Sequence, residues 1–416
     1  MNIVTAAVRT AGSLIVRAFD SIVDVVVRIL SFIESWVLDA KHAQYGVAVT
    51  RILLGVAGLG ILLSNFGARS YLLGAGSAWT GQVVEPISAL PDVWIFSSAS
   101  QVVGNTTLLT IFFLVVILLA LLVIVGWRGR VTLPLFLCLY VGLIEMENYT
   151  GDQGDNAFRI LFFFLLFTDH SARFSLDARR RAKPRVGSSR VLRVIDGEPF
   201  LPVWFTNALH NLALVIITVQ VCFIYAAGAL FKAGGDPWKN GTAVYNALTV
   251  ERYAIWPEIN ELITAWAPMA AAAAVGSIVL QMSFPFMLLN RFTRIIALFG
   301  ILSFHVAIGL FMGLPWFSMT MIAADAIFIR DKTYVRFGEI VRDTWRSVRG
   351  GPSRPRGPKG GPAGGGPAST AAQPAAPAEA PVSSDEHRPS PASGAPEREP
   401  AGTASAAAGP ASRRDG

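Results

Sequence analysis

The sequence predicts an all-α protein: a polytopic membrane bundle of about eight transmembrane helices, with an N-terminal amphipathic helix and a disordered C-terminal tail. Three observations predict it. Hydrophobic residues make up 53% of the chain and charged residues 15%, which is too apolar for an ordinary soluble protein. Several apolar runs approach the roughly 20 residues that cross a bilayer core, and backbone in lipid is satisfied within a helix. Basic and acidic loops alternate between these runs.

The first predicted domain is an amphipathic helix over residues 1–41. Its polar residues recur at steps of three or four, which places them on one helix face, and large apolar residues fill the rest. We expect this helix to lie at the membrane interface or against the bundle. A spanning helix is less favoured, because Asp20, Asp24 and Arg28 would then need partners at depth.

The second predicted domain, residues 42–335, holds the transmembrane helices. The spans are expected near 47–64, 107–125, 131–147, 157–169, 204–230, 263–289, 292–313 and 315–329. Loops after the even-numbered spans are rich in Lys and Arg, whereas the other loops are poor in them and carry acids. Because basic loops mark the cytoplasmic side, the alternation predicts a multi-pass protein of the cell membrane with both termini cytoplasmic.

The third predicted domain, residues 336–416, is a basic juxtamembrane segment followed by a disordered Pro/Ala/Gly-rich cytoplasmic tail. From residue 349 onward large apolar residues are almost absent, so burial cannot offset the entropy of ordering. The basic stretch 349–359 could touch anionic lipid, or the tail could simply be solvated. The net charge of +7 sits mainly in loops and tail, and no nucleic-acid motif accompanies it, so no nucleic-acid partner is expected.

The end of the fifth span carries the most informative residues. Lys232 stands where the hydrocarbon ends, and Gly234 and Gly235 are expected to stop the helix, with Pro237 preventing its resumption there. Burial among apolar groups favours the neutral form of a lysine, and a neutral amine can act as a general base. The alternative is an interfacial lysine that snorkels beside an aromatic-belt residue, Trp238.

A second cluster lies at the same outer side. The third span ends in Glu145 and Glu147, and the fourth opens with Asp155, Asn156 and Arg159. Asp155 and Arg159 are four residues apart and can pair on one helix face. At least one of the glutamates is expected to turn into the bundle, where Arg159 is the nearest cation in sequence. A structural ion pair between the two spans is the equal alternative. No histidine joins these carboxylates at ligand spacing, so no metal site is predicted.

Three more ionisable positions lie in or beside spans. His305 stands in the middle of the seventh span and needs a partner there, either as a packing residue or as a proton carrier. Arg51 opens the first span and is expected to snorkel to the inner face. Asp169 and Asp177, with nearby arginines, are expected to anchor the fourth span on the cytoplasmic side.

Together these residues resemble the HTTM (horizontally transferred transmembrane) domain family, which is related to the membrane domain of vitamin K-dependent gamma-carboxylase and to sporulation-delaying protein B. The family is largely bacterial, and the resemblance covers about residues 42–335. Its strongest part runs from Phe223 through Tyr225 and Lys232 to Asp236 and Trp238. Three further stretches agree in order: 48–55, 156–177 and 304–318.

The resemblance implies a role for Lys232. In the carboxylase a lysine of this stretch deprotonates vitamin K hydroquinone, so Lys232 is expected to be the catalytic base. The cofactor stays unknown, and a reduced quinone is one candidate. The residues expected to bind the substrate are Tyr225, Asp236, Trp238, Asn156, Arg159, Glu145, Glu147 and His305. The carboxylase has two adjacent lysines where this chain has Phe231 and Lys232, and a histidine where this chain has Asp155 and Asn156. The resemblance does not extend to its large extracytoplasmic domain, so carboxylation of a secreted client is not implied.

Two functions therefore remain open. In the first, an outward-facing pocket between the third, fourth, fifth and seventh spans binds a quinol or another small lipophilic ligand, with gamma-carboxylase-like proton abstraction by Lys232. In the second, the protein is a non-enzymatic membrane factor for maturation, export of, or immunity to a small peptide client. A transporter ranks last, because no internal repeat is evident. The lipid bilayer is an expected partner in every case.

Overall fold

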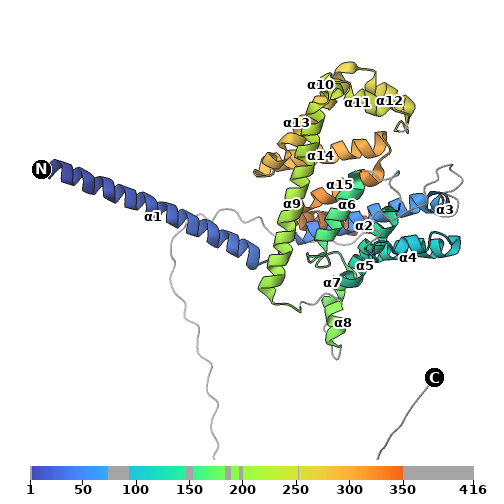
Figure 1. The fold of residues 1–416 in the computed structure, drawn as a ribbon, viewed down its shortest axis with the longest axis horizontal. Coiled ribbons are helices and arrows are strands. Elements are labelled where there is room, and N and C mark those ends of the chain that lie inside the picture. Colours follow the sequence, from blue (N-terminus) through green and yellow to red (C-terminus); the bar gives the residue numbers. More distant parts are fainter. Residues whose placement is uncertain are drawn as a thin grey trace, which may run out of the picture. The chain divides into compact units, whose positions relative to one another are not determined.

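The computed structural model describes residues 2–73, 93–146, 153–182, 189–195, 200–251 and 253–349. Over these ranges the chain is helical and contains no strand (Figure 1). The all-α prediction is confirmed. The predicted disordered tail lies outside the described residues, apart from its first residue, Arg349.

A helix coincides with each of the eight predicted spans. They are α2 (Gln44–Phe66), α4 (Thr106–Val125), α5 (Gly129–Ile144), α6 (Gln153–Leu165), α9 (Val203–Gly234), α13 (Ala267–Met287), α14 (Arg291–Phe311) and α15 (Pro315–Asp325). Five of them, α2, α4, α9, α13 and α14, are long and apolar enough to cross a membrane, and α5 is a shorter apolar helix. The chain is therefore a multi-pass membrane protein, while the count of eight spans stays a prediction.

Short helices connect these elements. They are α3 (Arg69–Leu72), η2 (Ser98–Gln101), α7 (Leu176–Arg181), α8 (Arg190–Ile195), α10 (Asp236–Lys239), α11 (Ala243–Thr249), α12 (Pro257–Thr264) and η3 (Ala326–Phe328). The break between α12 and α13 shortens the predicted sixth span, which begins at Ala267 instead of residue 263. Pro268 explains the later start, since a proline is tolerated in the first turn of a helix but not in its interior.

Local signals set the helix ends near the membrane surfaces. Asn105 caps α4 by accepting hydrogen bonds from the backbone N–H groups of Thr107 and Leu108. Gly126 ends α4 with a φ of 65°, a left-handed conformation that favours glycine. α9 ends at Gly234 and Gly235 as expected, but the chain resumes a helix at once, so the prediction for Pro237 is wrong. Pro237 lies in the first turn of α10, where its missing N–H costs nothing.

The helices pack around α2, α9 and α15. α2 packs against α4 and α15, α9 packs along α13, and α14 joins α13 to α15. A side chain at Gly60 would meet the ring of Trp316, so this glycine permits the close approach of α2 to α15. Large apolar side chains stay exposed on α4, α9, α13 and α14, as expected of helices that face a lipid bilayer.

The N-terminal segment forms one long helix, α1 (Asn2–Leu38). This confirms the helix predicted for residues 1–41, whereas its position at the membrane interface stays a prediction. Its end is fastened to α9, because Asn207 Nδ2 donates to the carbonyl of Leu38 at 2.8 Å.

A further helix, α16 (Asp331–Val348), lies largely in the segment that the sequence analysis assigned to a juxtamembrane region without predicting a helix. Asp331 fixes its start by accepting from the backbone N–H groups of Gln44 and Tyr45 at 3.1 Å. The signal was visible in the sequence, because Phe337, Val341 and Val348 recur at helical spacing.

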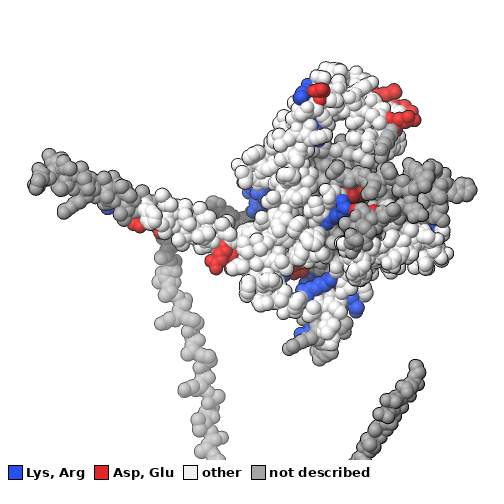
Figure 2. All heavy atoms as spheres, in the orientation of Figure 1, with Lys and Arg blue, Asp and Glu red and all other residues white. Residues whose placement is uncertain are grey.

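Charged side chains gather at opposite ends of the bundle. Figure 2 shows acidic side chains over α12 and basic side chains near α7 and α8, and the exposed residues include Glu258, Glu261, Arg179 and Arg193. This separation agrees with the alternation of the loops, while the cytoplasmic location of the termini stays a prediction.

Candidate functional site

Lys232 lies in the last turn of α9 and points into a niche between helices. Its Nζ donates to Oε1 of Gln281 on α13 at 2.6 Å. The same nitrogen stands 5.0 Å from the ring centroid of Trp238 on α10 and 4.9 Å from that of Phe304 on α14. Lys232 is half-buried, and within the described ranges no carboxylate forms an ion pair with it. The amine is therefore held among four helices instead of hanging free at the lipid headgroups.

A buried polar chain crosses the bundle next to this niche. Tyr225 on α9 donates its hydroxyl to Oδ2 of Asp325 on α15 at 2.7 Å. Nε2 of His305 on α14 lies 3.2 Å from the same hydroxyl oxygen. All three side chains are buried. His305 follows Phe304, whose ring contacts both the imidazole and Lys232. The side chain of Phe304 therefore lies between the niche and the polar chain.

The hydrogen bonds of Tyr225 set the order of protons in this chain. When the single hydroxyl proton of Tyr225 goes to Asp325, Nε2 of His305 donates to the tyrosine oxygen. Two buried atoms at the ends of the chain have no protein partner among the described residues, Nδ1 of His305 and Oδ1 of Asp325. Buried polar atoms of this kind call for a ligand or water.

The expected substrate-binding residues divide between two places. The structure brings Trp238, Tyr225 and His305 to the neighbourhood of Lys232. Asp236 is left out, because its side chain is 86% exposed and its carboxylate faces Lys239 at 3.4 Å. A direct contact of Asp236 with a ligand in the niche would require this side chain to turn.

The acidic cluster of the third and fourth spans forms an ion pair that is separate from the Lys232 niche. Glu145 at the end of α5 pairs with Arg159 of α6, and Nη2 of Arg159 lies 3.5 Å from Oδ1 of Asn156. The ion pair that the sequence analysis gave as the structural alternative between the third and fourth spans is therefore present. Glu147 lies outside the described residues. Whether any of these side chains binds a ligand stays a prediction.

We expect the Glu145–Arg159 pair to stabilise the bundle only slightly, because both side chains keep contact with solvent. In a double-mutant cycle of Glu145→Gln and Arg159→Gln, the coupling free energy should be no more than about 1 kcal/mol. Thermal unfolding in detergent micelles measures it. A coupling several times larger would show that the pair lies in a far less hydrated setting than its exposed fractions of 14% and 32% indicate.

A cavity of about 250 Å³ opens beside the Glu145–Arg159 ion pair. Its lining comes from α2, α3, α4, α5, α6 and α15 and includes Asp155, Phe113 and Trp316. The pocket was expected between the third, fourth, fifth and seventh spans, but α9 and α14 do not line this cavity. Phe317, which also lines it, packs against His305 with ring centroids 5.8 Å apart and so separates the cavity from the polar chain. No cluster of three or more potential metal ligands occurs in the part of the chain that the structure describes.

Residues 91–332, more than half of the chain, match the family model of the HTTM domain. The chain belongs to the HTTM domain family. The matched region contains Lys232, Tyr225, His305 and Asp325, whereas the first-helix stretch 48–55 precedes it. No curated protein and no solved structure matches the chain. The relation to gamma-carboxylase and to sporulation-delaying protein B stays an expectation.

In this HTTM protein Arg51 does not snorkel. Its side chain is fully buried and donates to four backbone carbonyls, those of Val123, Ile124, His170 and Phe174. The prediction is wrong because the end of α4 and the segment after α6 turn backbone carbonyl groups toward Arg51, and a guanidinium carries five donors to satisfy them. Arg51 is thus a clamp for backbone at the membrane boundary.

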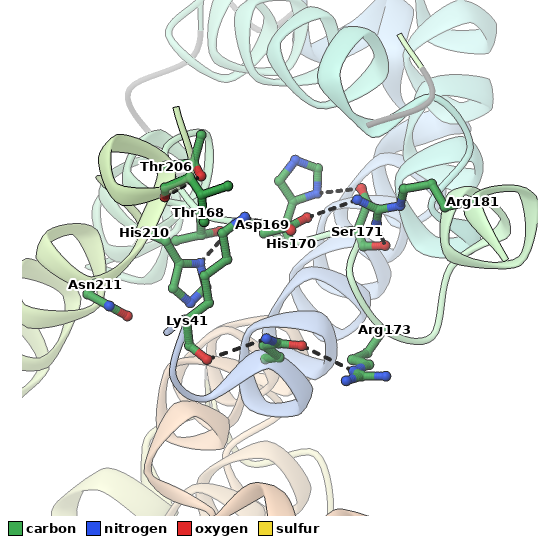
Figure 3. A network of polar contacts seen from close by, with 12 residues as sticks. Lys41, Thr168, Asp169, His170, Ser171, Arg173, Arg181, Thr206, His210 and Asn211 are labelled. Atoms are coloured by element: carbon green, nitrogen blue, oxygen red, sulfur yellow. Dashed lines mark hydrogen bonds and ion pairs between the residues drawn. The ribbon is translucent and has the colours of Figure 1, made fainter. Parts of the chain in front are cut away.

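The residues around Asp169 form a second polar network, shown in Figure 3. Asp169 pairs with Lys41 at 2.9 Å and with Arg181 at 3.4 Å. Burial alone would raise the pKa of Asp169, but these two cations outweigh it, so the pKa lies below its usual value. His210 of α9 accepts from the backbone N–H of Asp169 and donates to the carbonyl of His42. The network joins α7 and α9 to the link between α1 and α2.

Asp177 extends this anchoring to α5. Its carboxylate accepts from the backbone N–H groups of Arg128 and Gly129, both at 2.8 Å, at the start of that helix. The expected anchoring role of Asp169 and Asp177 therefore reaches beyond the fourth span.

Sequence reasoning missed Asp325 and Gln281. The signal for Asp325 was present, since an aspartate inside the apolar run of the eighth span is costly and calls for a partner. Gln281 carried no such signal, because a glutamine in a membrane helix can form hydrogen bonds with many kinds of group. Only the packing of α9 on α13 brings its amide to Lys232.

Proposed function

We propose that this HTTM protein binds a quinol or another amphipathic small molecule that bears a hydroxyl group, with Lys232 as its general base. The observation that supports this most is the setting of the amine. Gln281 holds Nζ, two aromatic rings flank it, and no described carboxylate pairs with it. A structural lysine at a membrane surface would instead be expected to reach headgroups or a counter-ion.

The proposed step is a proton transfer. The O–H bond of the ligand breaks and an N–H bond forms on the neutral amine of Lys232, which leaves an oxyanion and an ammonium. Oε1 of Gln281 accepts a hydrogen bond from either form of the amine. The rings of Trp238 and Phe304 stabilise the ammonium by cation–π attraction and offer an apolar surface to an aromatic ligand. The alternative, a non-enzymatic factor for a small peptide, needs none of these features.

The test compares lipid-soluble molecules that co-purify with the wild type and with Lys232→Met, which keeps the length of the side chain without its amine. Mass spectrometry of the extracts should show a bound molecule, with quinones sought first, whose occupancy falls about tenfold or more in the variant. Lys239→Met is the matched control, because Lys239 follows Lys232 by seven residues and its side chain is exposed.

We expect the control to retain the ligand at the level of the wild type. Equal occupancy of the bound molecule in the wild type and in Lys232→Met, with an unchanged cellular phenotype, would contradict the general-base proposal. It would favour the non-enzymatic factor for a small peptide.

A further inference from the structure

A recess of about 590 Å³ lies at the basic end of the bundle, and Lys232 does not line it. Its lining includes Val125, the last residue of α4, and Tyr45 in the first turn of α2. Both helices are long and apolar enough to cross a membrane, and each has one end at the recess. The recess therefore lies at the level where the hydrocarbon of the bilayer gives way to the lipid headgroups.

Two arginines without an acidic partner give the recess its charge. Arg173 and Arg179 both line it and are exposed. Nε of Arg173 donates to Oε1 of Gln44 at 3.2 Å (Figure 3), and its guanidinium lies over the ring of Tyr45. Among the described residues no carboxylate forms an ion pair with either arginine, and no acidic residue lines the recess. The recess thus offers two cations to a bound anion.

Most of the remaining lining is apolar, and part of it faces outward. Val125 is 44% exposed and Phe174 is 53% exposed. An inorganic anion would leave these side chains in contact with water, whereas the acyl chains of a lipid would cover them. Unpaired cations and exposed apolar groups lie side by side here, as an amphipathic anion requires.

We propose that this recess binds the headgroup of an anionic phospholipid, with its phosphate against Arg173 and Arg179 and its acyl chains along the exposed end of α4. A guanidinium can hold a phosphate through two parallel hydrogen bonds. A zwitterionic headgroup fits less well, because its ammonium would lie beside two arginines with no carboxylate in the lining to receive it. Basic pockets between membrane helices are a known setting for acidic headgroups.

This site is independent of the proton transfer proposed for Lys232, because the two share no residue. It lies next to the contacts of Arg51, since the carbonyl of Phe174 accepts from Nη2 of Arg51 at 2.7 Å. A lipid in the recess would therefore bridge the ends of α2 and α4 and the start of α7, where the buried arginine already joins them.

Native mass spectrometry of the full chain, released from detergent micelles, tests the inference. The probes are dioleoyl phosphatidylglycerol, dioleoyl phosphatidylcholine, which has the same chains but no net charge, and inorganic phosphate. The wild type should bind the phosphatidylglycerol about 20 times more tightly than the phosphatidylcholine, because each of two basic side chains near an anionic lipid contributes about fivefold. In Arg173→Gln/Arg179→Gln the two lipids should bind alike.

Two further variants test the place of binding. Arg336→Gln/Arg342→Gln removes the same number of charges from exposed positions of α16 that do not line the recess, and should keep the preference of the wild type. Ala178→Trp fills the recess without removing an arginine and should weaken the binding of phosphatidylglycerol.

Three outcomes would overturn the inference. Equal binding of the two lipids by the wild type would show that the recess does not select charge. An equal loss of preference in the two double-arginine variants would show a general attraction to the basic end of the protein. Displacement of the lipid by inorganic phosphate at the same concentration would show a site for the free ion instead of a phospholipid.

Discussion

Replacing Arg51 with leucine is expected to lower the free energy of unfolding by about 3 to 5 kcal/mol, because it leaves several backbone carbonyl groups inside the bundle without their donor. The carbonyl of Val123 would still receive the backbone N–H of Gly126. The carbonyls of Ile124, His170 and Phe174 would lose the guanidinium that now reaches them. A buried acceptor left bare, as at His170, costs about 1 to 3 kcal/mol, and the two partly buried carbonyls add less. The unfolding midpoint in detergent should fall by roughly 10 °C.

Arg51→Lys should restore only part of this loss, because a lysine carries all its donors on one nitrogen whereas the carbonyls lie around three nitrogens of the guanidinium. Arg173→Leu is the matched control. Arg173 is exposed, its side chain donates to Gln44 and its guanidinium lies over the ring of Tyr45, so this change should cost no more than about 1 kcal/mol. If Arg51→Leu proved as stable as the control, the hydrogen bonds of Arg51 between α2, α4 and the segment after α6 would contribute nothing measurable to the free energy of unfolding.

The helices of this protein could be predicted because the bilayer imposes a length and an apolar composition that a single segment displays. The end of α9 was equally visible, since glycine pairs stop helices through their own backbone freedom. Arg51 could not be placed in the same way. From the sequence one sees only that it opens an apolar run, whereas the carbonyls it binds lie 72 to 123 residues away.

The candidate site shows the same division. Lys232 attracted attention through its position at a helix end, and the prediction that it is sheltered agrees with its contacts. Its partners could not be predicted, because Gln281 is 49 residues away and Phe304 lies on another helix. Asp325 meets Tyr225 across 100 residues, so the acid that completes the polar chain becomes evident only when α9 and α15 pack together.

Stability should also fall as the pH drops from 6.5 to 5, because of His170. Burial first, and then the neighbouring cations Arg51, Arg181 and Arg130, lower the pKa of His170 to about 3, while Asp169 partly opposes them. In the unfolded chain the imidazole takes up its proton near pH 6.5, but in the folded protein only near pH 3. Acid therefore favours the unfolded state, by up to about 2 kcal/mol at pH 5. Above pH 7.5 the effect should vanish.

His170→Asn isolates this contribution, because asparagine has no proton to take up in this range. The difference in stability between the wild type and the variant should stay constant above pH 7 and shift toward the variant by up to about 2 kcal/mol at pH 5. Asp169 does not confuse the comparison. Its pKa is lowered in the folded protein, so its own contribution is lost only below the usual carboxyl range. Thermal unfolding from pH 5 to 8 measures the difference. Parallel curves for the two proteins would mean that the folded state protonates His170 as easily as the unfolded chain, and that water reaches the network drawn in Figure 3.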